Sequence, residues 1–450
     1  MGAPPLQAGD GRARPSADHV TPYDRCAWSD EEAEQLLASG AERQELEAFF
    51  GPAEYRELVR LARAAQRAKP RRRACRTIIV PGIMGSLLAL PRRAPLPRDV
   101  LWLDPIDICT GRLRELVFPG SARFEPCGIV LHSYLRLKLY LRIAGHDPVF
   151  HPYDWRCGVD ELGRQLAERL AGERADRLAL IGHSLGGLVC RAALGFASTG
   201  RAERSERIER VILLGTPNAG SFAPVQALRG TYAVVRKIAR LDDHHSAESL
   251  AAEVFNTFPS LYHMVPQGAG ARSLDFTDPC AWPESGPRPL PELLESARRV
   301  GRILAPADER FAVIVGVGLE TVTAASRRRD ELIYTVMRRG DGTVPADRAR
   351  LEGARHYFRA GVAHSDLTRD PLVASAVVDL LGRGETQRLP GKWRSASRAQ
   401  ARIGDRALTR LPAGKVDWSR LTPEERRAFL QHLNEPPKLE LRVPARARRQ

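Results

Sequence analysis

The sequence predicts an α/β protein built on a mostly parallel sheet with helices on both faces. From about residue 76, short apolar and β-branched runs alternate with segments of helical periodicity, which is typical of that class. A chain of 450 residues, 43% of them hydrophobic, can also bury a large core. Strands are expected at 77–81, 147–151, 177–182, 209–214, 311–316, 331–337 and 355–360, and helices at 159–171, 185–197 and 369–382.

Two long intervals, about 86–130 and 218–308, interrupt this alternation. Structureless loops of that length are uncommon in compact domains, so both are expected to be insertions with structure of their own. The catalytic body is expected to span 76–385.

The two ends of the chain differ from this body. Residues 1–22 are rich in Gly, Pro and Ala without periodicity and are predicted to be a disordered leader. Residues 23–75 are predicted to be a helical extension ending in a basic linker, with a capping-box pattern from Ser29 to Glu32. Residues 386–450 are predicted to be a basic C-terminal extension with one short helix, which Thr422 caps.

The net charge of +15 is concentrated near the C-terminus, where residues 388–450 hold 16 Lys and Arg against 6 Asp and Glu. Arginines at 394, 398, 402, 406 and 410 recur every four residues and would form a basic stripe on a helix. Such a stripe suits phosphates of lipid head groups or of nucleic acid. Because Trp393 is the sole aromatic residue among these arginines, we favour transient membrane-surface contact over nucleic-acid binding, and a plain solvated face is preferred to both.

The cysteines and the apolar runs indicate a reduced, cytoplasmic chain, peripheral to a membrane at most. The seven cysteines show no CxxC pairing, and residues 1–20 lack the apolar region of a signal peptide. The longest apolar stretch, 77–90, is too short and too interrupted to span a membrane. No metal or other cofactor is expected, because residues 242–245 (DDHH) fit a polar turn better than a metal site. Composition leaves the oligomeric state open.

The segment that indicates a catalytic residue is Gly182-His183-Ser184-Leu185-Gly186. It lies directly after an apolar strand and directly before a helix, the context in which GxSxG forms a tight turn that exposes the serine hydroxyl. The alternative is a glycine-rich turn that serves close packing alone. We predict Ser184 to be a nucleophile.

A serine nucleophile needs a base and an acid that orients the base. Asp341 lies in a glycine-rich turn after the predicted strand 331–337, where its alternative role is that of a turn residue. His364 follows Gly361 in the loop before a helix and is preferred as the base over His356, which falls inside a strand. His183 is expected to point away from the hydroxyl.

An oxyanion also needs two N–H donors. Leu185, the residue after the nucleophile, is expected to supply one of them. Ile83, beside Gly82 in the loop after the first strand, is expected to supply the other, unless that loop is a packing turn only.

These segments together resemble the lecithin:cholesterol acyltransferase and phospholipid:diacylglycerol acyltransferase family of α/β-hydrolases. The resemblance implies an α/β-hydrolase fold and agrees with the roles given to Ser184, Asp341, His364, Ile83 and Leu185. It extends over about 76–383 and rests on PGIMGS at 81–86, YDWR at 153–156, GHSLGG at 182–187, GTPNAGS at 215–221, FPSLYHMVP at 258–266 and GDGTVP at 340–345.

The resemblance also implies that the two insertions form a lid and a membrane-contact surface over an acyl-chain groove. Family members carry a lid disulfide; Cys109 and Cys127 lie in the matching interval, and free thiols are preferred here. Asp154 and Arg156 are better explained as a buried ion pair than as pocket residues. The candidate pocket or lid residues are Met84, Trp102, Tyr153, Trp155, Phe222 and Tyr262.

The sequence therefore predicts a serine-triad enzyme acting on lipid esters through an acyl-enzyme, as an O-acyltransferase, a lipase or a phospholipase. Two alternatives are a general carboxylesterase and a lipid- or partner-binding homologue without turnover. A third, a nucleic-acid-associated protein driven by its tail, predicts salt-dependent binding that survives deletion of 76–383.

Overall fold

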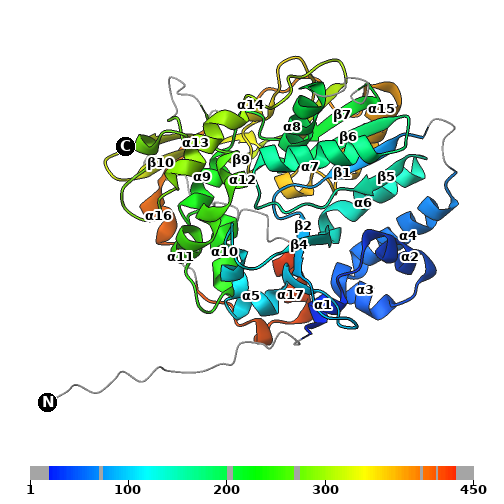
Figure 1. Ribbon diagram of the computed structural model, residues 1–450, viewed down its shortest axis with the longest axis horizontal. Coiled ribbons are helices and arrows are strands. Elements are labelled where there is room, and N and C mark those ends of the chain that lie inside the picture. Colours follow the sequence, from blue (N-terminus) through cyan, green and yellow to red (C-terminus); the bar gives the residue numbers. More distant parts are fainter. Residues whose placement is uncertain are drawn as a thin grey trace, which may run out of the picture.

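A six-stranded parallel sheet lies at the centre of the computed structural model (Figure 1). The structure describes residues 20–69, 74–199, 206–267, 274–395, 399–411 and 414–431. The sheet confirms the predicted fold class. Its strands are, in spatial order, β11 (Arg355–Ala360), β8 (Phe311–Val317), β7 (Ile208–Leu214), β6 (Leu178–His183), β1 (Arg76–Val80) and β5 (Asp147–Phe150).

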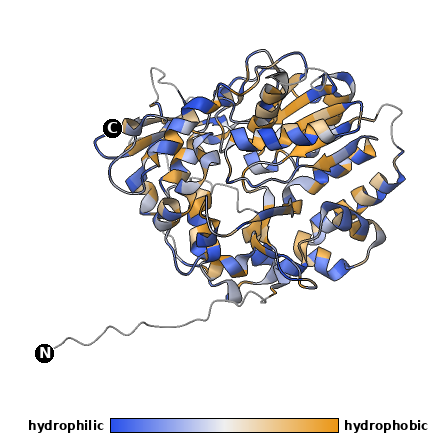
Figure 2. Cartoon of the chain, in the orientation of Figure 1, coloured by the Kyte–Doolittle hydropathy of each residue, from blue (hydrophilic) through white to orange (hydrophobic). Residues whose placement is uncertain are grey.

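Helices cover both faces of this sheet because its strands are apolar on both faces, as Figure 2 shows by their colour. Alternate residues enter two separate cores: Ile78 and Val80 pack on one side, and Ile79 packs on the other. One face carries α7 (Val159–Gly172) and α8 (Leu185–Thr199). The other carries α4 (Pro52–Arg67), α6 (Leu131–Ile143) and α15 (Pro371–Arg383).

The N-terminal extension shares the core of the domain that holds the central sheet. Leu58 and Leu61 of α4 belong to the same apolar cluster as Leu135 of α6. The extension begins with α1 (Pro22–Arg25), α2 (Asp30–Ser39), which starts with the predicted Ser29 capping box, and α3 (Arg43–Phe50). Most of the predicted leader and part of the basic linker lie outside the described residues.

The two insertions have regular structure of their own. The first forms a small antiparallel sheet in the order β3 (Asp99–Trp102), β2 (Ser86–Leu90), β4 (Glu125–Ile129), with α5 (Pro105–Cys109) and η1 (Arg112–Leu116). Cys109 and Cys127 are free thiols. The second is helical in the parts described, with α9 (Phe222–Leu228), α10 (Ala233–Leu241), α11 (Ala247–Glu253), η3 (Phe255–Thr257), α12 (Pro259–Tyr262), η4 (Pro279–Ala281) and α13 (Pro291–Val300).

The strand predicted at 331–337 exists but does not join the central sheet, contrary to the expected alternation. It is β10 (Leu332–Gly340), which pairs antiparallel with β9 (Leu319–Arg327) and β12 (Gln400–Gly404). The reason lies in burial: β8 is buried along its whole length, whereas β10 buries alternate residues over its first part, as in a sheet with one solvated face. Short α14 (Ala346–Ala349) follows β10.

The predicted arginine helix in the tail is wrong over residues 400–404. These residues form β12, because their backbone pairs with β10, and Arg402 lies opposite Thr335. Arg398 lies outside the described residues. The tail continues with α16 (Asp405–Thr409), η6 (Trp418–Arg420) and α17 (Pro423–Gln431), the last at the predicted helix, whose residues 432–433 are not described. In the described parts of the chain, no helix is long and apolar enough to cross a membrane.

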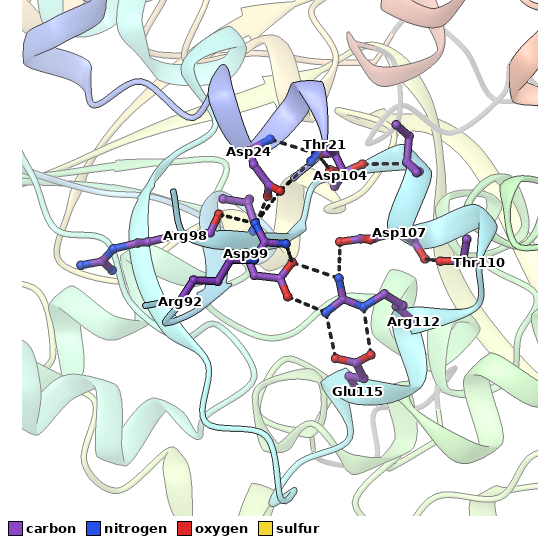
Figure 3. Close-up of polar contacts among 12 residues, drawn as sticks. Thr21, Asp24, Arg92, Arg98, Asp99, Asp104, Asp107, Thr110, Arg112 and Glu115 are labelled. Carbon is purple, nitrogen blue, oxygen red and sulfur yellow. Dashed lines mark hydrogen bonds and ion pairs between the residues drawn. The ribbon is translucent and has the colours of Figure 1, made fainter. Parts of the chain in front are cut away.

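A buried polar network connects α1 to the first insertion (Figure 3). The Asp24 carboxylate accepts from Arg92 and from the Val100 N–H, and Arg92 also contacts Asp99 at 3.0 Å. Arg112 then joins Asp99, Asp107 and Glu115.

Asp104 lies at the edge of this network, where it caps α5 and accepts a hydrogen bond from Thr21. Burial, together with repulsion from Asp107 and Asp24, raises the pKa of Asp104 from 3.8 to about 7. Because the folded pKa is the higher one, this group stabilises the fold below about pH 4, and that contribution is lost as the pH rises through 7.

We therefore expect Asp104→Asn to raise the melting temperature by a few degrees at pH 8.5 and to change it little at pH 5. The amide oxygen can still cap α5, and no charge has to be buried. Thermal melts at both pH values test this, with Asp243→Asn, an exposed carboxylate, as control. An equal shift at both pH values would contradict the assignment.

Candidate active site

Ser184 lies on a strained turn between β6 and α8. Its φ is +52°, a left-handed conformation that non-glycine residues rarely adopt. The Ser184 N–H is held by the Leu214 carbonyl at 2.9 Å. A Cβ at Gly186 would lie 2.2 Å from the Val80 carbonyl oxygen, so the turn requires a glycine there. This is the geometry expected for GxSxG between a strand and a helix.

Asp341 and His364 form a hydrogen-bonded pair, with 2.8 Å between Asp341 Oδ2 and His364 Nδ1. A carboxylate only accepts, so Nδ1 carries the proton and Nε2 is free to act as a base. The other carboxylate oxygen accepts from the backbone N–H groups of Thr343 at 3.0 Å and Val344 at 2.7 Å. The turn that follows β10 therefore holds the carboxylate in one orientation.

Gly215, in the GTPNAGS segment after β7, makes room for this pair. Its φ is +55°, and a Cβ there would lie 3.0 Å from His364 Nδ1 and 3.1 Å from Asp341 Oδ2. The pair consequently packs directly on the backbone of the chain segment next to the Ser184 turn.

Ser184 and His364 line one cavity of about 100 Å³, with no hydrogen bond between their side chains among the described residues. Catalytic hydrogen bonds are often long before a substrate binds. The second insertion supplies most of the apolar wall, including Ala223, Val235, Phe255, Leu261 and Met264.

Ile83 also lines this cavity, and Leu185 is the first residue of α8. Neither backbone N–H has an acceptor among the described residues, whereas the neighbouring Gly82 N–H is bound to the Tyr134 hydroxyl at 2.8 Å. The role of these two N–H groups in an oxyanion hole stays a prediction.

Tyr134 and His183 connect the two sides of the site, and the sequence analysis did not identify Tyr134. The Tyr134 hydroxyl, which accepts from Gly82, donates to His183 Nδ1 at 2.9 Å, and His183 Nε2 donates to the His364 carbonyl at 3.0 Å. Burial and the nearby His364 lower the pKa of His183 to about 3, so its ring is neutral. No local motif signals Tyr134, because it lies on α6, about 50 residues from either partner.

Five of the six predicted pocket residues do not line the Ser184 cavity. Met84 does, and Trp102 lies beside an adjoining small space. Tyr153 and Trp155 are buried and donate to the carbonyls of Pro81 (2.5 Å) and Ser86 (3.1 Å), so they support the loop after β1. Phe222 and Tyr262 are fully buried core residues.

Other candidate groups have structural partners. His356 Nε2 accepts from the Leu351 N–H, and Asp154 pairs with Arg156 at 2.7 Å. Asp242 accepts from the N–H groups of His244 and His245 and closes a turn. No cluster of three or more His, Cys, Asp or Glu side chains within the described ranges could hold a metal ion.

We expect Tyr134→Phe to lower kcat about 10- to 100-fold with little change in KM, because one buried hydrogen bond is lost and the Gly82 N–H is left unpaired. Steady-state kinetics with an ester substrate measure this effect. Tyr140→Phe, on the same helix, is the matched control. Equal kcat values in the two variants would argue against a positioning role.

The central sheet, the serine turn and the order Ser, Asp, His along the chain together define the class of this protein: it has the α/β-hydrolase fold. Residues 146–285 match the model of the lecithin:cholesterol acyltransferase family, which confirms over that range the resemblance predicted from the motifs. The matched range contains Ser184 but neither Asp341 nor His364, whose placement rests on the geometry above.

Several solved structures are similar to this chain. The mature Bacillus licheniformis lipase BlEst2 is 13% identical, with 71% of this chain and 95% of that chain covered and a TM-score of 0.36. A putative Acinetobacter baumannii lipase is 13% identical (70% and 86% covered, TM-score 0.33). The Bacillus subtilis carboxylesterase CesB is 12% identical (71% and 87% covered, TM-score 0.31). The search of curated proteins returned no match to this sequence.

Proposed function

We propose that the protein is a serine-triad enzyme that cleaves or transfers the acyl group of lipid esters. The observation that carries the proposal is the oriented Asp341–His364 pair, whose His364 lines the same cavity as Ser184, and Ser184 lies in a strained strand-to-helix turn. The match to the lecithin:cholesterol acyltransferase family supports lipid esters as the substrate class.

In the first half-reaction, Ser184 Oγ attacks the ester carbonyl carbon while His364 Nε2 takes the hydroxyl proton. The N–H groups of Ile83 and Leu185 stabilise the oxyanion of the tetrahedral intermediate. Asp341 stabilises the imidazolium and keeps its orientation. When the intermediate collapses, the alcohol leaves with the proton from His364, and the acyl group stays on Ser184.

In the second half-reaction, the oxygen of water or of an alcohol attacks the acyl-enzyme carbonyl carbon, and His364 Nε2 takes the proton of this acceptor. As the ester bond to Ser184 Oγ breaks, His364 returns the proton to Ser184 Oγ. Water yields a free fatty acid, whereas an alcohol yields a new ester. The apolar wall from the second insertion reduces the access of water to the acyl-enzyme, which favours transfer when an alcohol is bound.

The decisive experiment incubates the purified full chain with a panel of phospholipids and neutral lipids, with and without a long-chain alcohol. Mass spectrometry identifies the products, and Ser184→Ala serves as the blank. Free fatty acid alone assigns a lipase or phospholipase, and new esters assign an acyltransferase. A panel that the protein leaves intact under both conditions contradicts the proposal.

A further inference from the structure

A second cavity, of about 1070 Å³, lies beneath the N-terminal helices and the C-terminal segment. Its walls come mainly from segments that are far apart in sequence: α1 and the loop after it, α3, the first insertion, the start of α6, and residues 415–430. Apolar and aromatic side chains predominate, among them Trp28, Phe49, Ile106, Leu131 and Trp418.

This large cavity adjoins the cavity at Ser184 through a small space of about 20 Å³. The small space shares Met84, Ser133 and Ser365 with the Ser184 cavity. At its other side it shares four residues with the large cavity, namely Leu103, Val130, His132 and Leu430. The three spaces therefore adjoin one another in this order, and we call the small one between the other two the constriction.

The volumes limit what each space can hold. Pockets for drug-sized ligands usually measure about 300–1,000 Å³, so the 100 Å³ beside Ser184 suits only a short chain. A single water needs about 10–15 Å³, so the constriction has room for little more than one water. A long chain attached at Ser184 therefore exceeds the Ser184 cavity, and the large cavity beyond the constriction has the volume to receive it.

The chemistry of the large cavity suits a hydrocarbon rather than an anion. Two of the three cationic side chains that line it, Lys415 and Arg426, are bound to backbone carbonyls, those of His245 (2.7 Å) and Trp418 (3.1 Å) among them; Arg427 is the third. His132 stacks on Phe49 with 4.4 Å between ring centroids, and burial lowers its pKa to about 3, so it is neutral. The wall of the large cavity that can contact a bound molecule is therefore mostly apolar.

The wall at the constriction that is best able to move is α17. No described side chain of this helix is fully buried. Gln431 at its end donates to the Phe50 carbonyl at 3.1 Å, and the Phe429 ring contacts Lys237. A shift of α17 would carry Leu430 away from Met84 and widen the passage.

We propose that the large cavity receives the long hydrocarbon chain of the ester bound at Ser184, and that Leu430 on α17 controls its entry. This assignment rests on the proposed function, which supplies the ester linkage at Ser184. It adds a binding site that the N-terminal and C-terminal parts of the polypeptide form together. The hydrocarbon is either the acyl chain or the chain of the alcohol, and both place the same chemistry in the cavity.

The test substitutes Leu430→Trp to narrow the passage and uses Ala428→Trp, exposed on the same helix, as the matched control. Three esters separate the two sources of the chain: p-nitrophenyl butyrate is short on both sides, p-nitrophenyl palmitate has a long acyl chain, and hexadecyl butyrate has a long alcohol. We expect Leu430→Trp to lower kcat/KM about 10-fold or more for one long ester and to leave p-nitrophenyl butyrate unchanged. The long ester that is affected identifies which chain enters the cavity.

A Leu430→Trp variant that keeps the wild-type ratio of long-ester to short-ester turnover would overturn the proposal. Binding of the fluorescent fatty acid cis-parinaric acid gives a readout that does not depend on turnover. The wild type and Ala428→Trp should bind it, and Leu430→Trp should bind about 10-fold more weakly. If the wild type cleaves none of the esters, the proposed function fails. The binding of cis-parinaric acid then still tests whether the large cavity receives a hydrocarbon chain, and equal affinity in all three proteins overturns that proposal.

Discussion

Ser184→Ala should lower kcat for ester turnover by roughly 10⁶-fold, because removal of a triad nucleophile leaves only binding and the oxyanion donors. The substitution removes one oxygen at a turn whose backbone is held by the Leu214 carbonyl and by Gly186. The melting temperature is therefore expected to stay nearly unchanged. Ester kinetics and a thermal melt on the same preparation measure both effects.

Covalent labelling gives a second readout for the same residue. A fluorophosphonate probe should modify the wild-type protein on the peptide that contains Ser184 and should leave Ser184→Ala unmodified. Ser375→Ala, which removes the hydroxyl of a half-buried serine on α15, should label like the wild type. Wild-type turnover in Ser184→Ala would refute the mechanism.

Asp341→Asn should lower kcat by about 10⁴-fold with the fold intact. The Asn side-chain oxygen can still accept from Thr343 and Val344, so the turn after β10 is retained. Its NH₂ group would face His364 Nδ1, however, and would favour the tautomer in which Nε2 carries the proton and cannot act as a base.

Asp347→Asn, an exposed carboxylate on α14, is the control for this change of charge. We expect that control to retain wild-type kcat and Asp341→Asn to retain the wild-type melting temperature. A loss of less than about tenfold in Asp341→Asn, a difference of only 1.4 kcal/mol, would show that another group orients the base.

The elements that were predictable from the sequence have local causes. Strands β1, β6, β7 and β8 are short apolar runs that pair on both sides, and a strand buried on both faces is apolar along its whole length. The Ser184 turn was equally predictable, because small residues between a strand and a helix permit few backbone paths.

The predictions that differ from the structure concern the sheet that β10 joins and the positions of Tyr153 and Trp155, and both depend on tertiary packing. β10 has the composition of a strand, but its one-sided burial places it in the small sheet with β9 and β12. Tyr153 and Trp155 belong to the YDWR motif and were predicted to line the pocket. Both are instead buried beneath the loop after β1 and donate hydrogen bonds to its carbonyls. A motif locates a residue near a site, but its neighbours determine which way the side chain points.

By itself, the sequence determined the class of sheet and the serine turn, because each depends on residues that lie within a few positions of one another. Only the tertiary structure decided that Tyr134 joins Gly82 to His183, and that the two ends of the chain enclose a large cavity. Gln431 and Phe50, which meet at the edge of α17, are 381 residues apart. Such contacts come from the packing of whole elements, and local patterns do not encode that packing.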